Sequence, residues 1–212
     1  MTVWSPRAPS AFSGRVVGLF GGSFNPAHDG HRHIALTALA RLGLDEIWWL
    51  VSPQNPLKDS DQMMPQADRL RSAQEIARHP AMRVTDLETE LGTVYTAETL
   101  RLIARRYRRH QFVWLMGADN LIEIPRWKDW SKIFEIVPIA VFARPSYSAS
   151  ALAGVAAERF ARRRLSESRA RLVPRRRAPA WAFVHCPLHA ASATAIRAGL
   201  AASTQTATPA EQ

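Results

Sequence analysis

Near the N-terminus a strand, a glycine-containing loop and a helix follow one another directly, and this succession limits the fold more than any other feature. Residues 16–20 form an apolar run that is typical of a buried strand. After the loop, apolar residues recur at the spacing of one buried helix face, namely Ala35, Ala38, Leu39 and Leu42. The loop therefore lies at the carboxyl end of a first strand and leads into the N-terminus of a helix.

The composition of this loop is that of a phosphate site. From Gly21 to His31 it reads Gly-Gly-Ser-Phe-Asn-Pro-Ala-His-Asp-Gly-His. Unpaired backbone N–H groups and the helix dipole both favour an anion at a helix N-terminus. Gly21 and Gly22 allow the backbone to approach an anion closely, and His28 and His31 add donors that can stabilise charge on a phosphoryl oxygen. We therefore predict a nucleotide site here.

Two other interpretations of the loop are available. It could be a simple connection between strand and helix, because short glycine motifs occur in many turns. The His-x-Gly-His sequence could also be half of a metal site, although no cysteine or carboxylate cluster at ligand spacing accompanies it. The length and chemical consistency of the motif favour the nucleotide site.

Strands and helices alternate along the rest of the chain. Further strands are predicted at residues 46–51, 82–87, 112–116, 136–142 and 180–186. Helices are predicted at residues 66–78, 96–109 and 149–165, and again from Ser192. This alternation predicts an α/β fold with a Rossmann-like, doubly wound parallel sheet, in which loops at the carboxyl ends of the strands gather along one edge.

Length and composition indicate a single domain. The 212 residues suffice for one full core. We expect a loose N-terminal extension at residues 1–13, a domain at residues 14–201 and a disordered tail at residues 202–212. No run of 18 apolar residues is present, so we expect no membrane association. The single cysteine, Cys186, fits a reducing compartment and predicts a cytoplasmic protein.

The net charge of +10 favours anionic partners such as nucleotides, polyphosphates or RNA. Much of it is local, because residues 159–177 hold nine arginines and one acid, Glu167. Aromatic residues for base stacking are nearly absent there, so a charged surface is favoured over nucleic-acid binding. The sequence leaves the oligomeric state open, a homo-oligomer included.

Several separated motifs, kept in order from residue 15 to residue 200, resemble the nucleotidyltransferase superfamily that carries a His-x-Gly-His signature. The first motif is most similar to the bacterial nicotinate-nucleotide adenylyltransferase family. The others are Tyr-Thr-x-Glu-Thr-Leu at residues 95–100, Gly-x-Asp at 117–119, Arg-Pro at 144–145 and Ser-x-Thr-x-Ile-Arg at 192–197. This resemblance implies adenylyl transfer from ATP to nicotinate mononucleotide, which gives nicotinate adenine dinucleotide and pyrophosphate.

The resemblance also implies roles for individual residues. His28, His31 and Arg197 would be catalytic, with His28 and His31 near the reacting α-phosphorus. ATP would be bound by Gly21, Gly22, Ser23, Phe24, Gly30, Gly117, Asp119, Ser192 and Thr194. Nicotinate mononucleotide would be bound by Lys58, Thr96, Trp127 and Arg144. Mg2+ is expected as cofactor through ATP oxygens and water, without a metal site formed by side chains.

Structural alternatives exist for most of these side chains. Lys58 could be a solvated surface lysine, and Thr96 could cap a helix N-terminus. Trp127 and Trp130 could both be core anchors, of which Trp127 is the better ligand candidate. Near the C-terminus, alanines at positions 190, 191 and 193 replace residues that are usual in the family, which removes a hydroxyl from the pyrophosphate site.

Three other functions remain as alternatives. An adenylyltransferase for nicotinamide mononucleotide would differ only in the substrate carboxylate. An adenylyltransferase for pantetheine phosphate would share the first motif but typically has threonine at the position of His28. A protein of a different class, an RNA-binding protein with a degenerate nucleotide fold, would show steeply salt-sensitive binding without pyrophosphate release.

Overall fold

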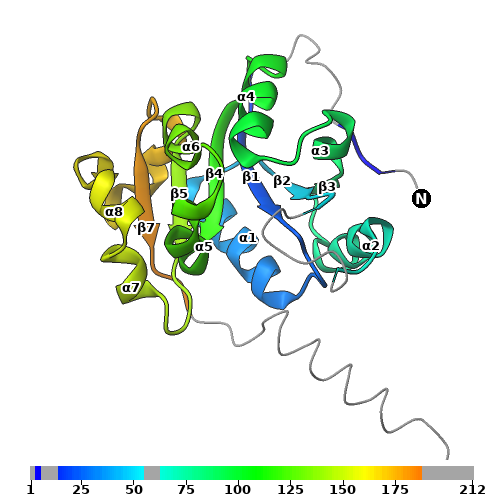
Figure 1. Cartoon of the computed structure of the whole chain (residues 1–212), viewed down its shortest axis with the longest axis horizontal. Coiled ribbons are helices and arrows are strands. Elements are labelled where there is room, and N and C mark those ends of the chain that lie inside the picture. Colours follow the sequence, from blue (N-terminus) through cyan, green and yellow to red (C-terminus); the bar gives the residue numbers. More distant parts are fainter. Residues whose placement is uncertain (1–2, 6–13, 55–62, 188–212) are drawn as a thin grey trace, which may run out of the picture.

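A single seven-stranded parallel sheet forms the centre of the molecule, which a computed structural model describes at residues 3–5, 14–54 and 63–187. The strand order is β3-β2-β1-β4-β5-β7-β6, and Figure 1 shows β7, β5, β4, β1, β2 and β3 side by side from left to right. The strands are β1 (Val16–Gly22), β2 (Glu46–Val51), β3 (Met82–Thr85), β4 (Gln111–Gly117), β5 (Ile139–Phe142), β6 (Arg164–Leu165) and β7 (Trp181–Val184). This confirms the predicted doubly wound α/β fold.

Helices cover both faces of the sheet. One face carries α1 (Asp29–Leu42), α2 (Gln66–Ile76) and the 3-10 helix η4 (Glu167–Arg175). The other carries α3 (Leu87–Glu90), α4 (Thr96–Arg106), α5 (Ala118–Glu123), η2 (Ile124–Arg126), α6 (Trp130–Ile136), α7 (Ser148–Leu152) and α8 (Val155–Arg159), followed by η3 (Ala161–Arg163).

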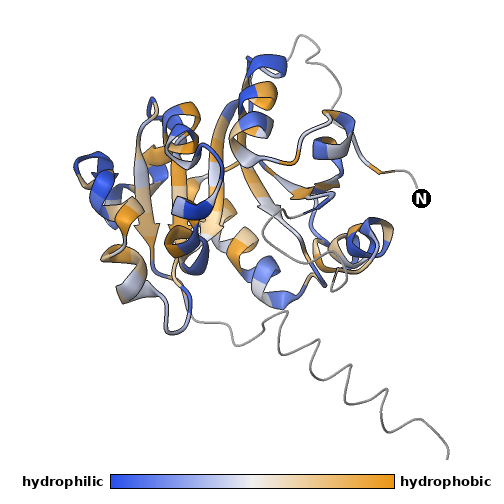
Figure 2. Cartoon of the chain, viewed as in Figure 1, coloured by the Kyte–Doolittle hydropathy of each residue, from blue (hydrophilic) through white to orange (hydrophobic). Residues whose placement is uncertain are grey.

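Side chains along each strand alternate between the two hydrophobic cores. In β2, Trp48 and Leu50 pack beneath α4, whereas Ile47, Trp49 and Val51 pack beneath α1 and α2. A strand buried on both faces reads as a continuous apolar run, which is why 46–51 was recognisable as a strand. Figure 2 shows β4 and β5 mainly in hydrophobic colours, while α4 alternates between hydrophobic and hydrophilic residues.

Several element boundaries differ from those predicted. The fifth strand begins at Ile139 rather than at residue 136, because residues 130–136 form α6 and Pro138 cannot donate a ladder hydrogen bond. The third strand ends at Thr85, where α3 follows almost at once. The helix predicted at 149–165 is broken into α7, α8 and η3, with Gly154 as the N-cap of α8.

Part of the N-terminal extension packs against the domain. The Trp4 ring contacts the Trp48 ring edge to face at 5.4 Å between centroids, and the Ser5 hydroxyl donates to Glu90 at 2.7 Å. A large aromatic side chain gains more from this contact than from exposure to water. Residues 3–5 are therefore held against α3 and β2 and are not a loose segment, while residues 202–212 lie outside the described residues.

The strand order places a topological switch point between β1 and β4. From β1 the chain proceeds to β2 and β3 on one side, and β4 is followed by β5 on the other. At such a switch point the connecting loops diverge and leave a crevice beyond the carboxyl ends of the two strands. The loop after β1 and the Gly117–Asp119 turn after β4 both lie at this position.

Candidate active site

The His-x-Gly-His sequence forms the N-terminus of α1 through a reciprocal capping arrangement. His28 is the N-cap and is only 4% exposed, and its Nδ1 accepts the Gly30 backbone N–H at 3.1 Å. In return, Nδ1 of His31 accepts the His28 backbone N–H at 3.2 Å. Histidines here do what a hydroxyl residue and a glutamate do in an ordinary capping box. The motif therefore has a structural role in addition to any chemical one.

This capping arrangement decides which ring nitrogens can donate. Because Nδ1 of each ring accepts a backbone N–H, the proton of each neutral imidazole lies on Nε2. The two rings lie 3.8 Å apart between centroids with an interplanar angle of 34°. These two imidazoles lie at the positive end of a 14-residue helix, a position where a phosphate is favoured.

Phe24 holds the loop in this conformation. Its backbone is left-handed (φ 45°), which is strained for a non-glycine residue, and its side chain is 2% exposed. The ring stacks on Trp49 at 5.1 Å and contacts the His31 ring at 5.0 Å. Because the ring is buried, only the backbone of Phe24 can contact the predicted ATP.

The two glycines after the first strand have a packing role. Both belong to β1, and a Cβ at Gly21 would lie 2.2 Å from the Trp114 ring. A Cβ at Gly22 would lie 3.3 Å from the Phe24 ring. The Trp114 ring therefore excludes any side chain larger than that of glycine at position 21, and the Phe24 ring leaves little room for one at position 22.

Asp119 and Arg144, predicted to bind different substrates, form an ion pair with each other. Asp119 Oδ1 lies 3.5 Å from Nε of Arg144, which follows β5. A Cβ at Gly117 would lie 2.3 Å from Asp119 Oδ1 and 2.9 Å from Arg144 Nε, so only glycine admits this approach. Asp119 Oδ1 accepts no hydrogen bond within the described part of the chain. This oxygen is held near a cation and still has capacity to accept from a ligand.

A hollow of about 260 Å3 joins the first loop to the end of β5. It is lined by Gly30, His33 and Ile34 of α1, by Ala143, Arg144 and Pro145, and by Pro187. Residues far apart in sequence therefore meet beside the N-terminus of α1. Pro187, the last described residue before the segment that carries Ser192, Thr194 and Arg197, is thus among the residues that line this hollow.

Arg69 of α2 connects the loops after β1 and β2, and sequence reasoning did not identify it. The side chain is 1% exposed, and burial lowers its pKa from the usual value. Its guanidinium donates to four backbone carbonyls, at 2.7–3.0 Å, of Ser23, Ser52, Pro53 and Met64. Carbonyl oxygens thus compensate a buried charge, and the two loops are held in one register.

Thr96 does not cap the N-terminus of α4, which was the structural alternative for this residue. Tyr95 is the N-cap of α4, Thr96 is the first helical residue, and no side chain caps this end. The Tyr95 carbonyl instead accepts three groups, the backbone N–H groups of Glu98 and Thr99 and the Thr99 hydroxyl. Thr96 is half-buried, and its hydroxyl forms no hydrogen bond to another described residue, which leaves it available to a ligand.

Trp127 lies near this turn. Nζ of Lys128, the next residue, stands 4.2 Å from the centre of the Tyr95 ring, which brings the segment after η2 against the start of α4. Trp127 is half-buried against the core, whereas Trp130 packs edge to face on Phe134 and Phe160. Trp130 is therefore a core anchor, and Trp127 remains the better ligand candidate.

Four predicted site residues lie outside the described residues. They are Lys58 in the loop after β2 and Ser192, Thr194 and Arg197 near the C-terminus. The predicted last helix lies there as well. The described site therefore comprises the first loop, the Gly117–Asp119 turn, Arg144, and the turn at Thr96 with Trp127.

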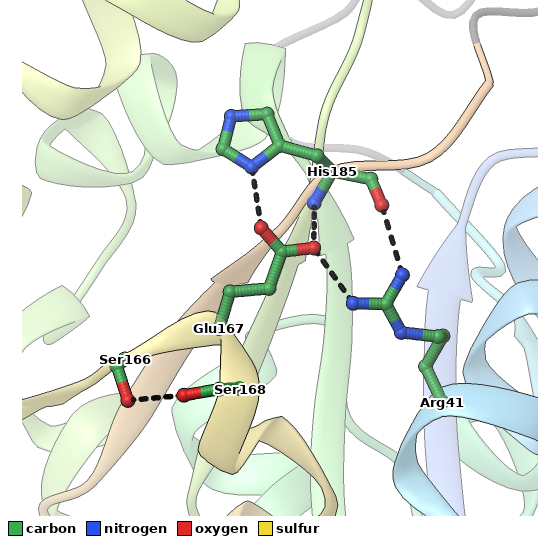
Figure 3. Close-up of polar contacts among 5 residues, drawn as sticks. All are labelled: Arg41, Ser166, Glu167, Ser168 and His185. Atoms are coloured by element: carbon green, nitrogen blue, oxygen red, sulfur yellow. Dashed lines mark hydrogen bonds and ion pairs between the residues drawn. The ribbon is translucent and has the colours of Figure 1, made fainter.

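A polar cluster fixes the end of β7, where the chain turns toward the C-terminal segment (Figure 3). Glu167 accepts from Arg41 at 2.7 Å and from the His185 backbone N–H at 3.0 Å, and His185 Nδ1 lies 2.7 Å from its other oxygen. Burial alone raises the Glu167 pKa, but the hydrogen bonds from His185 and Arg41 lower it overall. The one acid of the arginine-rich segment thus ties η4 to α1 and β7.

The arginines at the end of this segment lie away from the candidate site. Arg175, Arg176 and Arg177 line a hollow of about 790 Å3 with Gln111 and Phe112 at the amino end of β4. The predicted site occupies the opposite, carboxyl edge of the sheet. These residues therefore take no part in binding at the switch point.

The described residues contain no group of three or more His, Cys, Asp or Glu side chains arranged to hold a metal. Within residues 3–5, 14–54 and 63–187, no helix has the length and apolar character needed to cross a membrane.

Comparison with known proteins identifies the family of this chain. Residues 19–199 match the cytidylyltransferase-like family model. The chain is 50% identical over 182 residues to a "probable nicotinate-nucleotide adenylyltransferase" of Rhizobium meliloti strain 1021, covering 86% of this chain and 97% of that one. It is 52% identical over 183 residues to a protein of the same description from Cereibacter sphaeroides strain ATCC 17023, covering 86% and 96%.

Solved structures resemble this fold as well. The nicotinic acid mononucleotide adenylyltransferase of Plasmodium falciparum complexed with NaAD superimposes with a TM-score of 0.65 at 15% identity, covering 86% of this chain and 82% of that one. The same enzyme complexed with APC gives a TM-score of 0.63 over the same shares. At this identity the likeness supports the fold, and the sequence relatives establish the family. The chain therefore belongs to the nicotinate-nucleotide adenylyltransferase family, within the wider cytidylyltransferase-like family.

Proposed function

We infer that this protein transfers the adenylyl group of ATP to nicotinate mononucleotide, giving nicotinate adenine dinucleotide and pyrophosphate in NAD biosynthesis. The observation that carries this conclusion is the pair of adjacent imidazoles of His28 and His31 at the N-terminus of α1, beside the β1–β4 switch point, in a chain 50% identical to a relative named for this activity. The substrates are accordingly ATP and nicotinate mononucleotide. We expect the reaction to take place in the cytoplasm, because a chain with a single cysteine fits a reducing compartment.

The chemistry requires positioning more than proton transfer. The phosphate of nicotinate mononucleotide is already ionised near neutral pH, so attack on the α-phosphorus of ATP needs neither a general base nor a covalent intermediate. Rate enhancement then comes from in-line alignment of two anions and from donors that stabilise the transition state. His28 and His31, held by their own capping contacts, would donate from Nε2 to oxygens around the α-phosphorus.

The remaining ATP contacts follow the crevice. The backbone of residues 21–24 and Gly30 would lie along the triphosphate, and Asp119 Oδ1 would accept from a ribose hydroxyl. Arg144, beside Gly30 in the same hollow, would contact a substrate phosphate while keeping its ion pair with Asp119. Ser192, Thr194 and Arg197 would hold the departing pyrophosphate.

Magnesium fits as part of the ATP substrate. Within the described site the carboxylate of Asp119 is already paired with Arg144, so a protein cage for the ion is not favoured. We propose that Mg2+ is carried on ATP phosphate oxygens and water, where it would neutralise charge on the triphosphate.

The pyridine ring would lie at the start of α4. There the Thr96 hydroxyl and the backbone N–H groups of Thr96 and Ala97, at the start of an 11-residue helix, could receive the nicotinate carboxylate. The half-buried Trp127 would cover one face of the electron-poor ring. Lys58 would contact the phosphate of this substrate.

The direct test is pyrophosphate release from ATP with nicotinate mononucleotide, nicotinamide mononucleotide and pantetheine phosphate compared side by side. We expect nicotinate mononucleotide to give the highest kcat/KM. A higher kcat/KM with nicotinamide mononucleotide or with pantetheine phosphate would show that this compound is the preferred acceptor instead. If none of the three acceptors released pyrophosphate from ATP, the proposed adenylyl transfer would be contradicted.

Thr96→Val should lower the preference for the acid over the amide by about three- to tenfold. Valine has nearly the same shape but cannot donate to the carboxylate, and one such hydrogen bond contributes about 0.5–1.5 kcal/mol. The ratio of kcat/KM for the two acceptors measures the effect, with the KM for ATP as internal control. An unchanged ratio would remove Thr96 from the substrate site.

A further inference from the structure

Glu88 is a buried carboxyl group for which the proposed chemistry has no use. It lies on α3 and is only 6% exposed. Its neighbours belong to segments on either side of the candidate site. Glu88 Oε1 lies 3.1 Å from the Thr99 hydroxyl of α4, and Ser52, which follows β2 and whose hydroxyl donates to the Gln54 carbonyl at 2.8 Å, also lies near this carboxyl. The Ser52 backbone N–H in turn donates to the Gly22 carbonyl at 3.1 Å.

Thr99 connects this carboxyl to the turn that begins α4. Its hydroxyl oxygen lies 3.1 Å from Glu88 Oε1, 2.8 Å from the Thr93 hydroxyl and 3.2 Å from the Tyr95 carbonyl. The Thr93 backbone N–H donates to the Glu88 carbonyl at 2.9 Å. The segment from Thr93 to Tyr95, directly before Thr96, is therefore held from both sides by Glu88 and Thr99.

A count of protons shows that this network has two states. The Thr99 hydroxyl has one proton, so it cannot donate to Glu88 and to the Tyr95 carbonyl at once. If Glu88 is neutral, its own O–H donates to Thr99, and Thr99 donates to Tyr95. If Glu88 is ionised, Thr99 must donate to the carboxylate, and the Tyr95 carbonyl loses its side-chain donor.

Charges near Glu88 do not force either state. The Thr99 hydroxyl faces it from α4, Ser52 lies near it at the end of β2, and Gln66 of α2 donates to the hydroxyl of the neighbouring Thr89. Glu90 on the same helix turns outward to Arg106 and Ser5. Among the described residues no charged group contributes to the Glu88 pKa. Burial raises it to about 7, against which the bonds from Thr99 and Ser52 act.

We propose that Glu88 is a positioning residue for nicotinate mononucleotide, which in its neutral form orders the Tyr95–Thr96 turn through Thr99. Ionisation removes the Thr99–Tyr95 hydrogen bond and loosens the turn. It also brings a negative charge toward the place where the substrate carboxylate would bind. This inference rests on the proposed function and specifies the protonation state that its pyridine subsite requires.

The test is the pH dependence of KM for nicotinate mononucleotide from pH 6 to 8.5. In the wild-type protein we expect KM to rise about three- to tenfold with a midpoint near pH 7, the effect of one hydrogen bond. Glu88→Gln, whose amide donates to Thr99 at every pH, should keep the low KM throughout. The substrate phosphate titrates identically in both proteins, so the difference between their profiles isolates Glu88.

Three further variants make the result specific. Thr99→Ala should have a high KM for nicotinate mononucleotide that no longer changes with pH as Glu88 ionises. Thr99→Ser, which keeps the hydroxyl, should show the wild-type pH profile. Glu90→Gln, on the exposed side of the same helix, should leave the profile unchanged. Glu88→Gln with the wild-type profile, or Thr99→Ser with the profile of Thr99→Ala, would overturn the proposal.

A measurement without substrate separates this inference from the proposed function. Between pH 5 and 7.5 the melting temperature of wild-type protein should fall relative to that of Glu88→Gln, because protons bind the folded form more tightly. Parallel melting curves would contradict the assigned protonation change. Absence of pyrophosphate release from wild-type protein with nicotinate mononucleotide would instead contradict the proposed function.

Discussion

His31→Ala should lower kcat by about 10²- to 10³-fold, the usual cost of losing one donor to transition-state charge. The KM for ATP should change much less, because the contact strengthens as charge shifts during transfer. Steady-state pyrophosphate release gives both constants. Normal kcat with only a raised KM would contradict a catalytic role for His31.

This substitution also removes a structural contact, since His31 Nδ1 accepts the His28 backbone N–H. Loss of a capping contact destabilises a helix by about 1 kcal/mol. His31→Gln separates the two roles, because glutamine at this position can complete a capping box but has no imidazole. We expect His31→Gln to retain the wild-type melting temperature and to lose kcat as His31→Ala does. Recovery of kcat in His31→Gln would show that capping alone is required.

Arg69→Met should lower the free energy of unfolding by about 3–5 kcal/mol, comparable to breaking a buried polar pair. The methionine would leave four backbone carbonyls without this donor, including those of Ser23 and Ser52. Because these carbonyls belong to the loops after β1 and β2, the KM for ATP should also rise. Chemical denaturation measures the first effect and pyrophosphate release the second.

Arg71→Met is the matched control on the same helix. The Arg71 side chain is 58% exposed and pairs with Asp68 one turn away, a contact that contributes little in water. We expect a change within about 0.5 kcal/mol and an unaltered KM. Equal effects of the two substitutions would show that the carbonyl contacts of Arg69 do not stabilise the loops.

Local sequence pattern was sufficient for most of the sheet. Residues 46–51 and 112–116 were recognisable because strands covered on both faces are continuously apolar. The pattern was less informative where elements are short. The four residues of α3 and the two of β6 cannot show a periodicity, and the arginine-rich region after Gly154 is helical in short pieces because packing against β7 interrupts it.

The partners of the buried polar residues were not predictable from sequence. Arg69 contacts carbonyls as far as 46 positions away, and Glu88 reaches a hydroxyl 11 positions away. A backbone carbonyl carries no sequence signal, so nothing distinguishes Arg69 from the exposed arginines around it. The pairing of Asp119 with Arg144 was likewise invisible, because both were recognised only as ends of separate strands.

By itself the sequence determined the parallel α/β class, the position of the first loop at a strand end and the family to which the chain belongs. These properties depend on local periodicity and on a contiguous motif. Only the tertiary structure decided that the histidines cap α1 through Nδ1, that Gly21 makes room for Trp114, and that Glu88 is buried beside the turn at Tyr95 and Thr96. Those outcomes depend on which segments the strand order brings together, and the free energy of such contacts is a property of the packed chain.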